Sequence, residues 1–160
     1  MLVRVDGVQK VQRGGTLLRY RALVIGGNAK GCAGFGIAKA GSPVEAQNAA
    51  SRMCKRNVFF VDRHNGSGLT RDLVGKHNSC RVHLYAVDAQ RGLHGNPLVC
   101  EILAFFGIAD CTAKTYGNRN QFNVVRATFK ALLTHESLED IALKRGKRLM
   151  NLERAKRLNI

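Results

Sequence analysis

A series of short alternating stretches, joined by glycine turns and followed by a helix cap, restricts the fold of this chain more than any other feature. Apolar and polar side chains alternate along residues 18–24, which is typical of a half-buried strand with a basic outer face. Glycine turns lie on both sides of this strand, at 13–15 and 26–31. Residues 42–45, Ser-Pro-Val-Glu, form a capping box with proline at the first helical position. We therefore predict three antiparallel strands followed by a helix that ends near residue 57.

The second half of the chain carries strand and helix signals in a different order. Strand patterns at 69–74, 80–86 and 108–115 enclose a helix that begins at Pro97 and ends at Gly107. A last long helix follows, because apolar residues recur there at helical spacing. The order β-β-α-β-α predicts a two-layer sandwich, and the whole chain is predicted to be α+β. The flexible composition of residues 63–68 predicts a boundary between the two halves.

The charge of the chain points to a polyanionic partner. Lys and Arg total 26 and Asp and Glu total 11, so the formal net charge is +15. Nucleic acid is the first candidate for such a chain, and an anionic membrane surface is the second. No apolar run approaches the ~20 residues of a membrane span. The absence of Trp and the small number of aromatic residues argue against single-stranded bases stacking on aromatic side chains.

The sequence contains no catalytic or metal-binding pattern. Its five cysteines show no Cys-x-x-Cys spacing and are odd in number, which argues against a zinc site or a disulfide framework and favours buried, reduced thiols. There is no Ser-His-Asp order, and the adjacent Glu139 and Asp140 point apart on a helix. We therefore predict no catalytic residues, no metal and no cofactor.

Residues 115–130 combine an amide-rich loop with the start of the last helix. The loop 118–121 precedes that helix, where free backbone N–H groups and the positive end of the helix dipole favour phosphate. Within the helix, Asn123, Arg126 and Lys130 lie on a stripe apart from the apolar one and suit phosphate oxygens. The alternative for Arg126 and Lys130 is pairing with acids inside the protein.

These residues resemble one known family. Residues 114–128, Lys-Thr-Tyr-Gly-Asn-Arg-Asn-Gln-Phe-Asn-Val-Val-Arg-Ala-Thr, are similar to the signature helix of the fifth protein of the small ribosomal subunit, of bacterial and organellar type. The stretches 8–24, 31–39 and 142–147 are similar to further motifs of that family in the same order, so the resemblance covers nearly the whole chain. Gln121 stands where the family has a proline before its helix.

The resemblance implies a structural constituent of the small ribosomal subunit that binds rRNA near the messenger entry and decoding region. It implies a double-stranded-RNA-binding-like domain at 1–63, an α/β sandwich domain at 64–135, and a basic helix and tail at 136–160. The implied partners are small-subunit rRNA and the fourth and eighth small-subunit ribosomal proteins, with the messenger RNA path nearby.

Departures from the family pattern, together with the five cysteines, favour a ribosome of the mitochondrial matrix. Another organelle and the bacterial cytoplasm are the alternatives. The first residues do not form a signal peptide, and no transit peptide is visible in the sequence.

Two rival functions remain open, a free regulator that binds double-stranded RNA and a small-molecule kinase with a related second-domain fold. The kinase is disfavoured because the sequence shows neither a magnesium-binding carboxylate nor a glycine-rich loop that opens a helix. The residues predicted to bind RNA are Arg13, Gly14, Gly15, Arg19, Arg21, Lys30, Lys39, Lys76, Lys114, Asn118, Arg119, Asn120, Asn123, Arg126, Arg145 and Lys147.

Overall fold

The computed structural model describes residues 1–150, and in this range the chain forms two four-stranded sheets and four helices. The first sheet has the order β1-β2-β3-β4 and the second the order β5-β6-β8-β7. The elements are β1 Leu2–Gln12, β2 Gly15–Gly27, β3 Cys32–Ala40, α1 Pro43–Arg56, β4 Val58–Phe60, β5 Leu73–His77, β6 Cys80–Ala86, β7 Leu93–Gly95, α2 Pro97–Phe106, β8 Cys111–Gly117, α3 Gln121–Leu133 and α4 Leu138–Lys144. This is the predicted α+β class. The predicted basic tail beyond Met150 lies outside the described residues.

The first sheet follows the predicted strand order, and its helix begins at the predicted cap. The Ser42 hydroxyl accepts a hydrogen bond from the Glu45 N–H at 3.2 Å, and Pro43 opens α1. The helix lies so close to β3 that a Cβ at Gly36 would collide with the backbone oxygen of Ala50. Glycine on β3 is therefore a packing requirement of the α1 contact.

The second sheet differs from its prediction at β7. Residues 93–95 form a short strand parallel to β8, and α2 is the crossover between the two. The sequence pattern indicates only a loop there, because three residues are too few to display an alternation. The helix itself ends as predicted, with Gly107 in the left-handed region at φ 78°. The strand predicted at 69–74 lies instead at 73–77.

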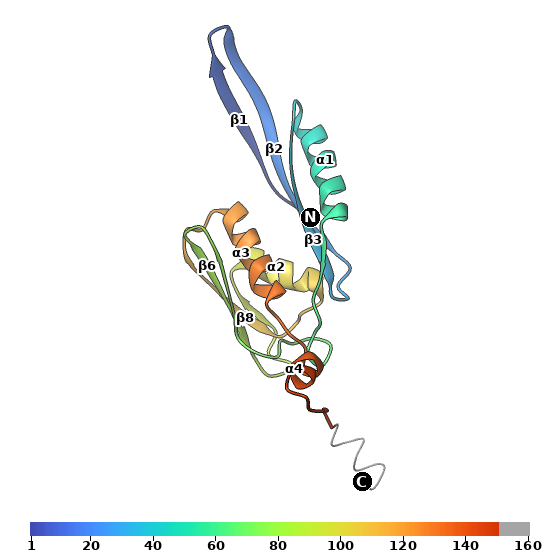
Figure 1. The fold of residues 1–160 in the computed structure, drawn as a ribbon. Coiled ribbons are helices and arrows are strands. Elements are labelled where there is room, and N and C mark those ends of the chain that lie inside the picture. The colour runs from blue at the N-terminus through green and yellow to red at the C-terminus, as the bar shows by residue number, and fades with distance from the viewer. Residues whose placement is uncertain (151–160) are drawn as a thin grey trace.

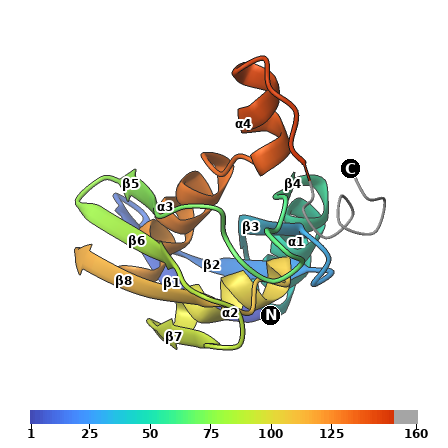
Figure 2. The same cartoon turned by 90° about the horizontal axis from the view of Figure 1, so that it is seen from below.

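The two halves share one apolar core. On β2, Ala22 and Val24 pack with α1, while Leu23 and Ile25 belong to the core that includes α2, α3 and the second sheet. The first sheet is thus covered on both faces near its base (Figures 1 and 2). The predicted outer face of β2 is covered near the base of the sheet, because α2 and α3 of the second half pack on it. Leu23 has no exposed surface there, while the Arg21 side chain remains 34% exposed.

Aromatic rings mark the centre of this shared core. The ring of Phe129 on α3 lies 4.8 Å from Phe35 and 5.5 Å from Phe59, both in the first sheet. It also lies 5.5 Å from Phe106 on α2. One side chain therefore joins both halves.

The β1–β2 hairpin projects from this body (Figure 1). Val11 near its tip is 79% exposed, and every residue from Gln9 to Arg19 is exposed. The strands are paired up to Gln12 and Gly15, so the turn is Arg13-Gly14. The result is a two-stranded ribbon that carries no core of its own.

The last helix, α4, is short and capped as its sequence predicts. Ser137 accepts a hydrogen bond from the Asp140 N–H at 3.1 Å, and Lys144 pairs with Glu136 at 2.8 Å. None of the helices in residues 1–150 is long and apolar enough to cross a membrane.

Candidate nucleic-acid interface

The side chains of two asparagines hold the loop before α3 in place by hydrogen bonds to its backbone. The side chain of Asn118 accepts from the Asn120 N–H at 2.8 Å, and the side chain of Asn120 caps α3 by accepting from the Phe122 N–H at 3.0 Å. The N–H of Asn118 donates to the carbonyl oxygen of Ser79 at 3.0 Å. Asn120 therefore supplies the helix cap directly before Gln121, the residue that replaces the family's proline.

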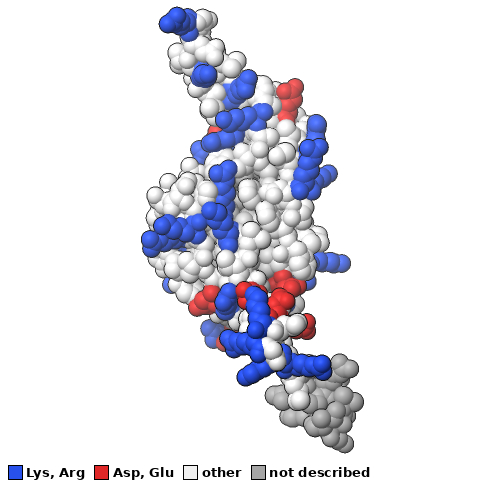
Figure 3. All heavy atoms as spheres, viewed as in Figure 1, with Lys and Arg blue, Asp and Glu red and all other residues white. Residues whose placement is uncertain are grey.

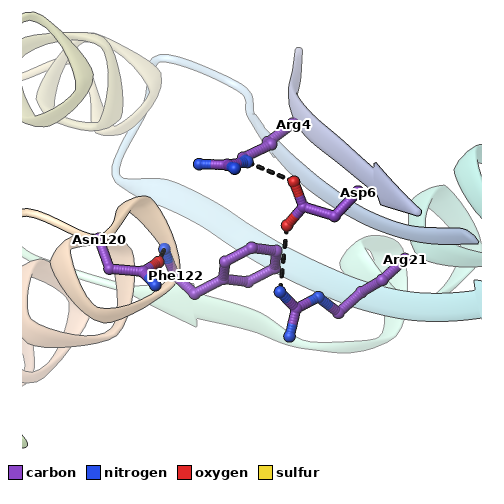
Figure 4. A network of polar contacts seen from close by, with 5 residues as sticks. All are labelled: Arg4, Asp6, Arg21, Asn120 and Phe122. Carbon is purple, nitrogen blue, oxygen red and sulfur yellow. Dashed lines mark hydrogen bonds and ion pairs between the residues drawn. The ribbon is translucent and has the colours of Figure 1, made fainter. Parts of the chain in front are cut away.

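A polar network holds the start of α3 against the base of the hairpin (Figure 4). The Arg21 guanidinium lies 4.0 Å from the centre of the Phe122 ring and donates to Asp6 at 3.1 Å. Arg4 donates to the other carboxylate oxygen of Asp6, and this hydrogen bond is the main reason why the pKa of Asp6 lies below its ordinary value. Arg21, predicted on an exposed face, thus connects the two halves.

Three cations from the second half lie on α3 and on the loop that precedes it. Asn78 in the β5–β6 turn donates to the Asn123 side chain at 3.4 Å, which brings the turn beside the helix. We call these exposed side chains the α3 basic surface; they are Arg119, Arg126 and Lys130. No Asp or Glu occurs in residues 73–87 or 111–135, so internal pairing within these stretches is ruled out.

His77 lies close to the positive charges of this surface, which affect its pKa. Burial lowers the pKa of His77, and the nearby Lys130 and Arg126 lower the pKa further. Its Nε2 atom is buried without a hydrogen-bond partner. A phosphate at this surface would meet an uncompensated positive field.

A surface hollow of about 420 Å³ opens beside the β5–β6 turn. Its lining residues are Lys76, Asn78, Ser79, Arg81, Tyr116 and Gly117. Of these, only Lys76 is among the residues predicted to bind RNA. The alternation of residues 80–86 places Arg81 on an outer face, but nothing in the sequence places β8 beside it.

The other predicted residues lie in four separate places. Arg13, Gly14, Gly15, Arg19 and Lys39 lie on the projecting hairpin and its neighbouring strand end, Lys30 lies in the β2–β3 turn, and Arg145 and Lys147 follow α4. Lys114 lies on the outer face of β8, with its Nζ 5.7 Å from the centre of the Tyr85 ring. Figure 3 shows Lys and Arg on the hairpin and on the body beside it, while much of the visible Asp and Glu gathers near α4.

The thiols and the described acids show no arrangement for catalysis or metal binding. Burial raises the pKa of the Cys111 thiol to about 12 and also raises the pKa of Cys54 and Cys80. Asp110 is buried and accepts from Gly92 and Ser67, which keeps its pKa low. Across residues 1–150, no three Cys, His, Asp or Glu side chains come together as metal ligands.

The fold is α+β with two sheets, and it carries a projecting basic hairpin and a basic surface without carboxylates. This combination is typical of the class of basic proteins that bind RNA. The family comparison is specific. The family "Ribosomal protein S5, N-terminal domain" matches residues 1–62, and "Ribosomal protein S5, C-terminal domain" matches residues 75–145. The chain belongs to the ribosomal protein S5 family. That family is structural and not enzymatic, so the kinase alternative is wrong.

Several curated bacterial proteins are similar to the chain over nearly its full length. The small ribosomal subunit protein uS5 of Bradyrhizobium diazoefficiens is 36% identical over 152 residues, which are 95% of this chain and 77% of that protein. The proteins of the same name from Rhodopseudomonas palustris and Brucella abortus are 37% and 36% identical over 152 residues, with 80% and 82% of their lengths covered.

Proposed function

We propose that this chain is a structural constituent of the small ribosomal subunit and that it holds rRNA through the α3 basic surface and the β1–β2 hairpin. Membership of the ribosomal protein S5 family supports this role. The observation that carries the mechanism is the presence of three exposed cations, Arg119, Arg126 and Lys130, in a stretch without a carboxylate. Such a surface neutralises phosphates without first breaking internal ion pairs.

Recognition depends on the shape and backbone of the RNA. The deep major groove of an A-form helix is closed to side chains, so contacts fall on phosphates and on the shallow groove. The hairpin suits this task because it is a thin ribbon with Arg13 at its tip and Arg19 on one face. Gly14 has no atom within 4 Å of an added Cβ, so its backbone is open to close approach by RNA.

The place of the chain in the subunit is part of the same proposal. We place it near the messenger entry and decoding region, beside the fourth and eighth small-subunit proteins. Segment 1–63 would act as the double-stranded-RNA-binding-like domain, 64–135 as the sandwich domain, and 136–160 as a basic extension. We favour a mitochondrial ribosome, and the bacterial uS5 relatives make the bacterial cytoplasm the main alternative.

Co-sedimentation with small subunits tests the proposal. Tagged wild-type chain should travel with the subunit through a sucrose gradient, whereas Arg126→Glu combined with Lys130→Glu should remain near the top. A matched control is Arg52→Glu combined with Arg56→Glu, which reverses two exposed cations at the same helical spacing on α1. If both double variants lost co-sedimentation equally, binding would depend on net charge alone and not on the α3 basic surface. Wild-type chain that stays at the top would contradict the ribosomal role.

A further inference from the structure

The second sheet leaves one broad face uncovered. Helices α2 and α3 both lie on its other face (Figures 1 and 2). On the open face, Val74 is 55% exposed and Tyr116 is 47% exposed. A sheet face with two exposed large side chains and no covering helix is available to a partner.

The strand register arranges this open face in rows. Lys76, Arg81 and Tyr116 are direct neighbours across β5, β6 and β8. The adjacent row is Val74, His83 and Lys114. Because cross-strand partners share a face, both rows point the same way, and Tyr85 lies on this face two residues beyond His83.

Aromatic rings form a diagonal across these rows. His83 meets Tyr116 edge to face with the ring centres 5.0 Å apart, and the rings of His83 and Tyr85 are 6.2 Å apart. Two of the three tyrosines of the chain are thus gathered at one place. The low aromatic content of the whole chain argues against base stacking in general. That argument does not hold for this face, where aromatic rings are concentrated.

Cations surround the aromatic diagonal. Lys76 and Arg81 lie on one side and Lys114 on the other, while the hollow of about 420 Å³ lies between Tyr116 and the first two. Its volume falls in the range of about 300–1,000 Å³ typical of small-ligand sites. Asn78 and Ser79 add hydrogen-bonding groups at its wall.

This combination suits an unpaired nucleotide better than a duplex or a protein. A paired base hides its faces in the stack, whereas an unpaired base offers a π-face to an aromatic ring and its phosphate to a cation. A protein partner would require a larger apolar area than Val74 and Tyr116 supply together. Asp72, whose charge acts on Tyr85, already accepts from the Ala86 N–H at 2.8 Å.

We propose that the open face of the second sheet binds an unpaired segment of RNA, with one base stacked on Tyr116 in the hollow and its phosphates on Lys76 and Arg81. This inference rests on the proposed RNA-binding function and adds the kind of RNA that this face takes. It separates the roles of two surfaces, because the α3 basic surface and the hairpin serve paired RNA while the sheet face serves unpaired nucleotides.

Fluorescence anisotropy with two RNA probes tests the proposal on the full chain. The probes are a short labelled single strand and a blunt duplex of about 16 base pairs. Tyr116→Leu should weaken binding of the single strand by about 5- to 150-fold, the loss typical of one stacked base, and should leave duplex binding unchanged. Tyr116→Phe should bind both probes as the wild type does, because it keeps the ring.

The control Phe60→Ala removes another exposed aromatic side chain, 62% exposed on β4, and should change neither affinity. Unchanged binding of the single strand by Tyr116→Leu overturns the inference, as does an equal loss for both probes. Wild-type binding of the duplex without the single strand also overturns it and leaves the proposed function standing. Failure to bind either probe would contradict the proposed function itself.

A crosslink in the assembled subunit distinguishes the classes of partner. A photoreactive amino acid at Val74 should attach to RNA. Attachment to a protein would overturn the inference and assign the sheet face to a protein neighbour.

Discussion

The two sheets of this molecule differ in how their faces are covered. Near its base, the first sheet has α1 on one face and α2 with α3 on the other, so consecutive residues of β2 are buried. The second sheet has helices on one face only, and its other face carries rings and cations in solvent. A substitution should therefore change folding stability in the first location and RNA binding in the second.

The largest expected effect is on the core that joins the halves. Phe129→Ala removes a ring that is 2% exposed and contacts both halves, so it should lower the free energy of unfolding by about 3–5 kcal/mol. Val74→Ala on the open face should change it by less than about 0.5 kcal/mol. Urea unfolding at constant pH measures both. Similar losses in the two variants would contradict the contrast between the covered and open regions.

The next largest effect is the difference in folding stability between substitutions in the covered part of the first sheet and in its exposed hairpin. Gly36→Ala places a methyl group against the backbone of α1 and should destabilise the chain by about 1–3 kcal/mol. Gly14→Ala at the hairpin tip meets no atom within 4 Å and should leave stability nearly unchanged. Thermal unfolding of the two variants is the measurement. A stable Gly36→Ala protein would show that α1 is not in close contact with β3.

The smallest expected effect is the pH dependence of folding stability that comes from His135, just after the end of α3. Burial, followed by the charge of Arg71, lowers the pKa of His135 from its ordinary value of 6.5, and its Nε2 accepts from the Thr70 N–H at 3.0 Å. Because the folded pKa is the lower one, the unfolded chain binds the proton more readily. His135 therefore contributes stability that is fully present above about pH 6.5 and declines as the pH falls.

Urea midpoints between neutral and mildly acidic pH measure this decline. His135→Gln should make the decline shallower, and the remaining decline comes from His77, whose pKa is also lowered, whereas His94→Gln at an exposed position should leave the profile as in the wild type. A wild-type profile without any acid-side decline would contradict the assignment.

Local signals predicted local structure well in this chain. The helix starts at Ser42 and Ser137 and the helix end at Gly107 follow from residues within one turn of each cap. The signature stretch likewise predicted α3 and placed Arg126 and Lys130 on a stripe apart from its apolar face. Each of these features depends only on neighbouring residues.

Features that depend on distant contacts were not predictable. Leu23 lies on the outer face that the alternation of β2 predicts, and it is buried only because α2 and α3 pack on that face. Arg21 on the same face is half-buried against the Phe122 ring of α3. Tyr116 lies beside Arg81 because β6 pairs with β8 across an intervening strand and helix. No alternation pattern encodes that register, so the sheet face and its hollow become visible only in the structure.

The salt dependence of binding to an rRNA fragment tests the central claim, that the α3 basic surface holds RNA through its phosphates. The logarithm of the association constant should fall linearly with the logarithm of the salt concentration. Arg126→Gln combined with Lys130→Gln should reduce the magnitude of the slope by about 2, whereas Tyr116→Leu should leave the slope unchanged. An unchanged slope in the double variant would contradict the claim.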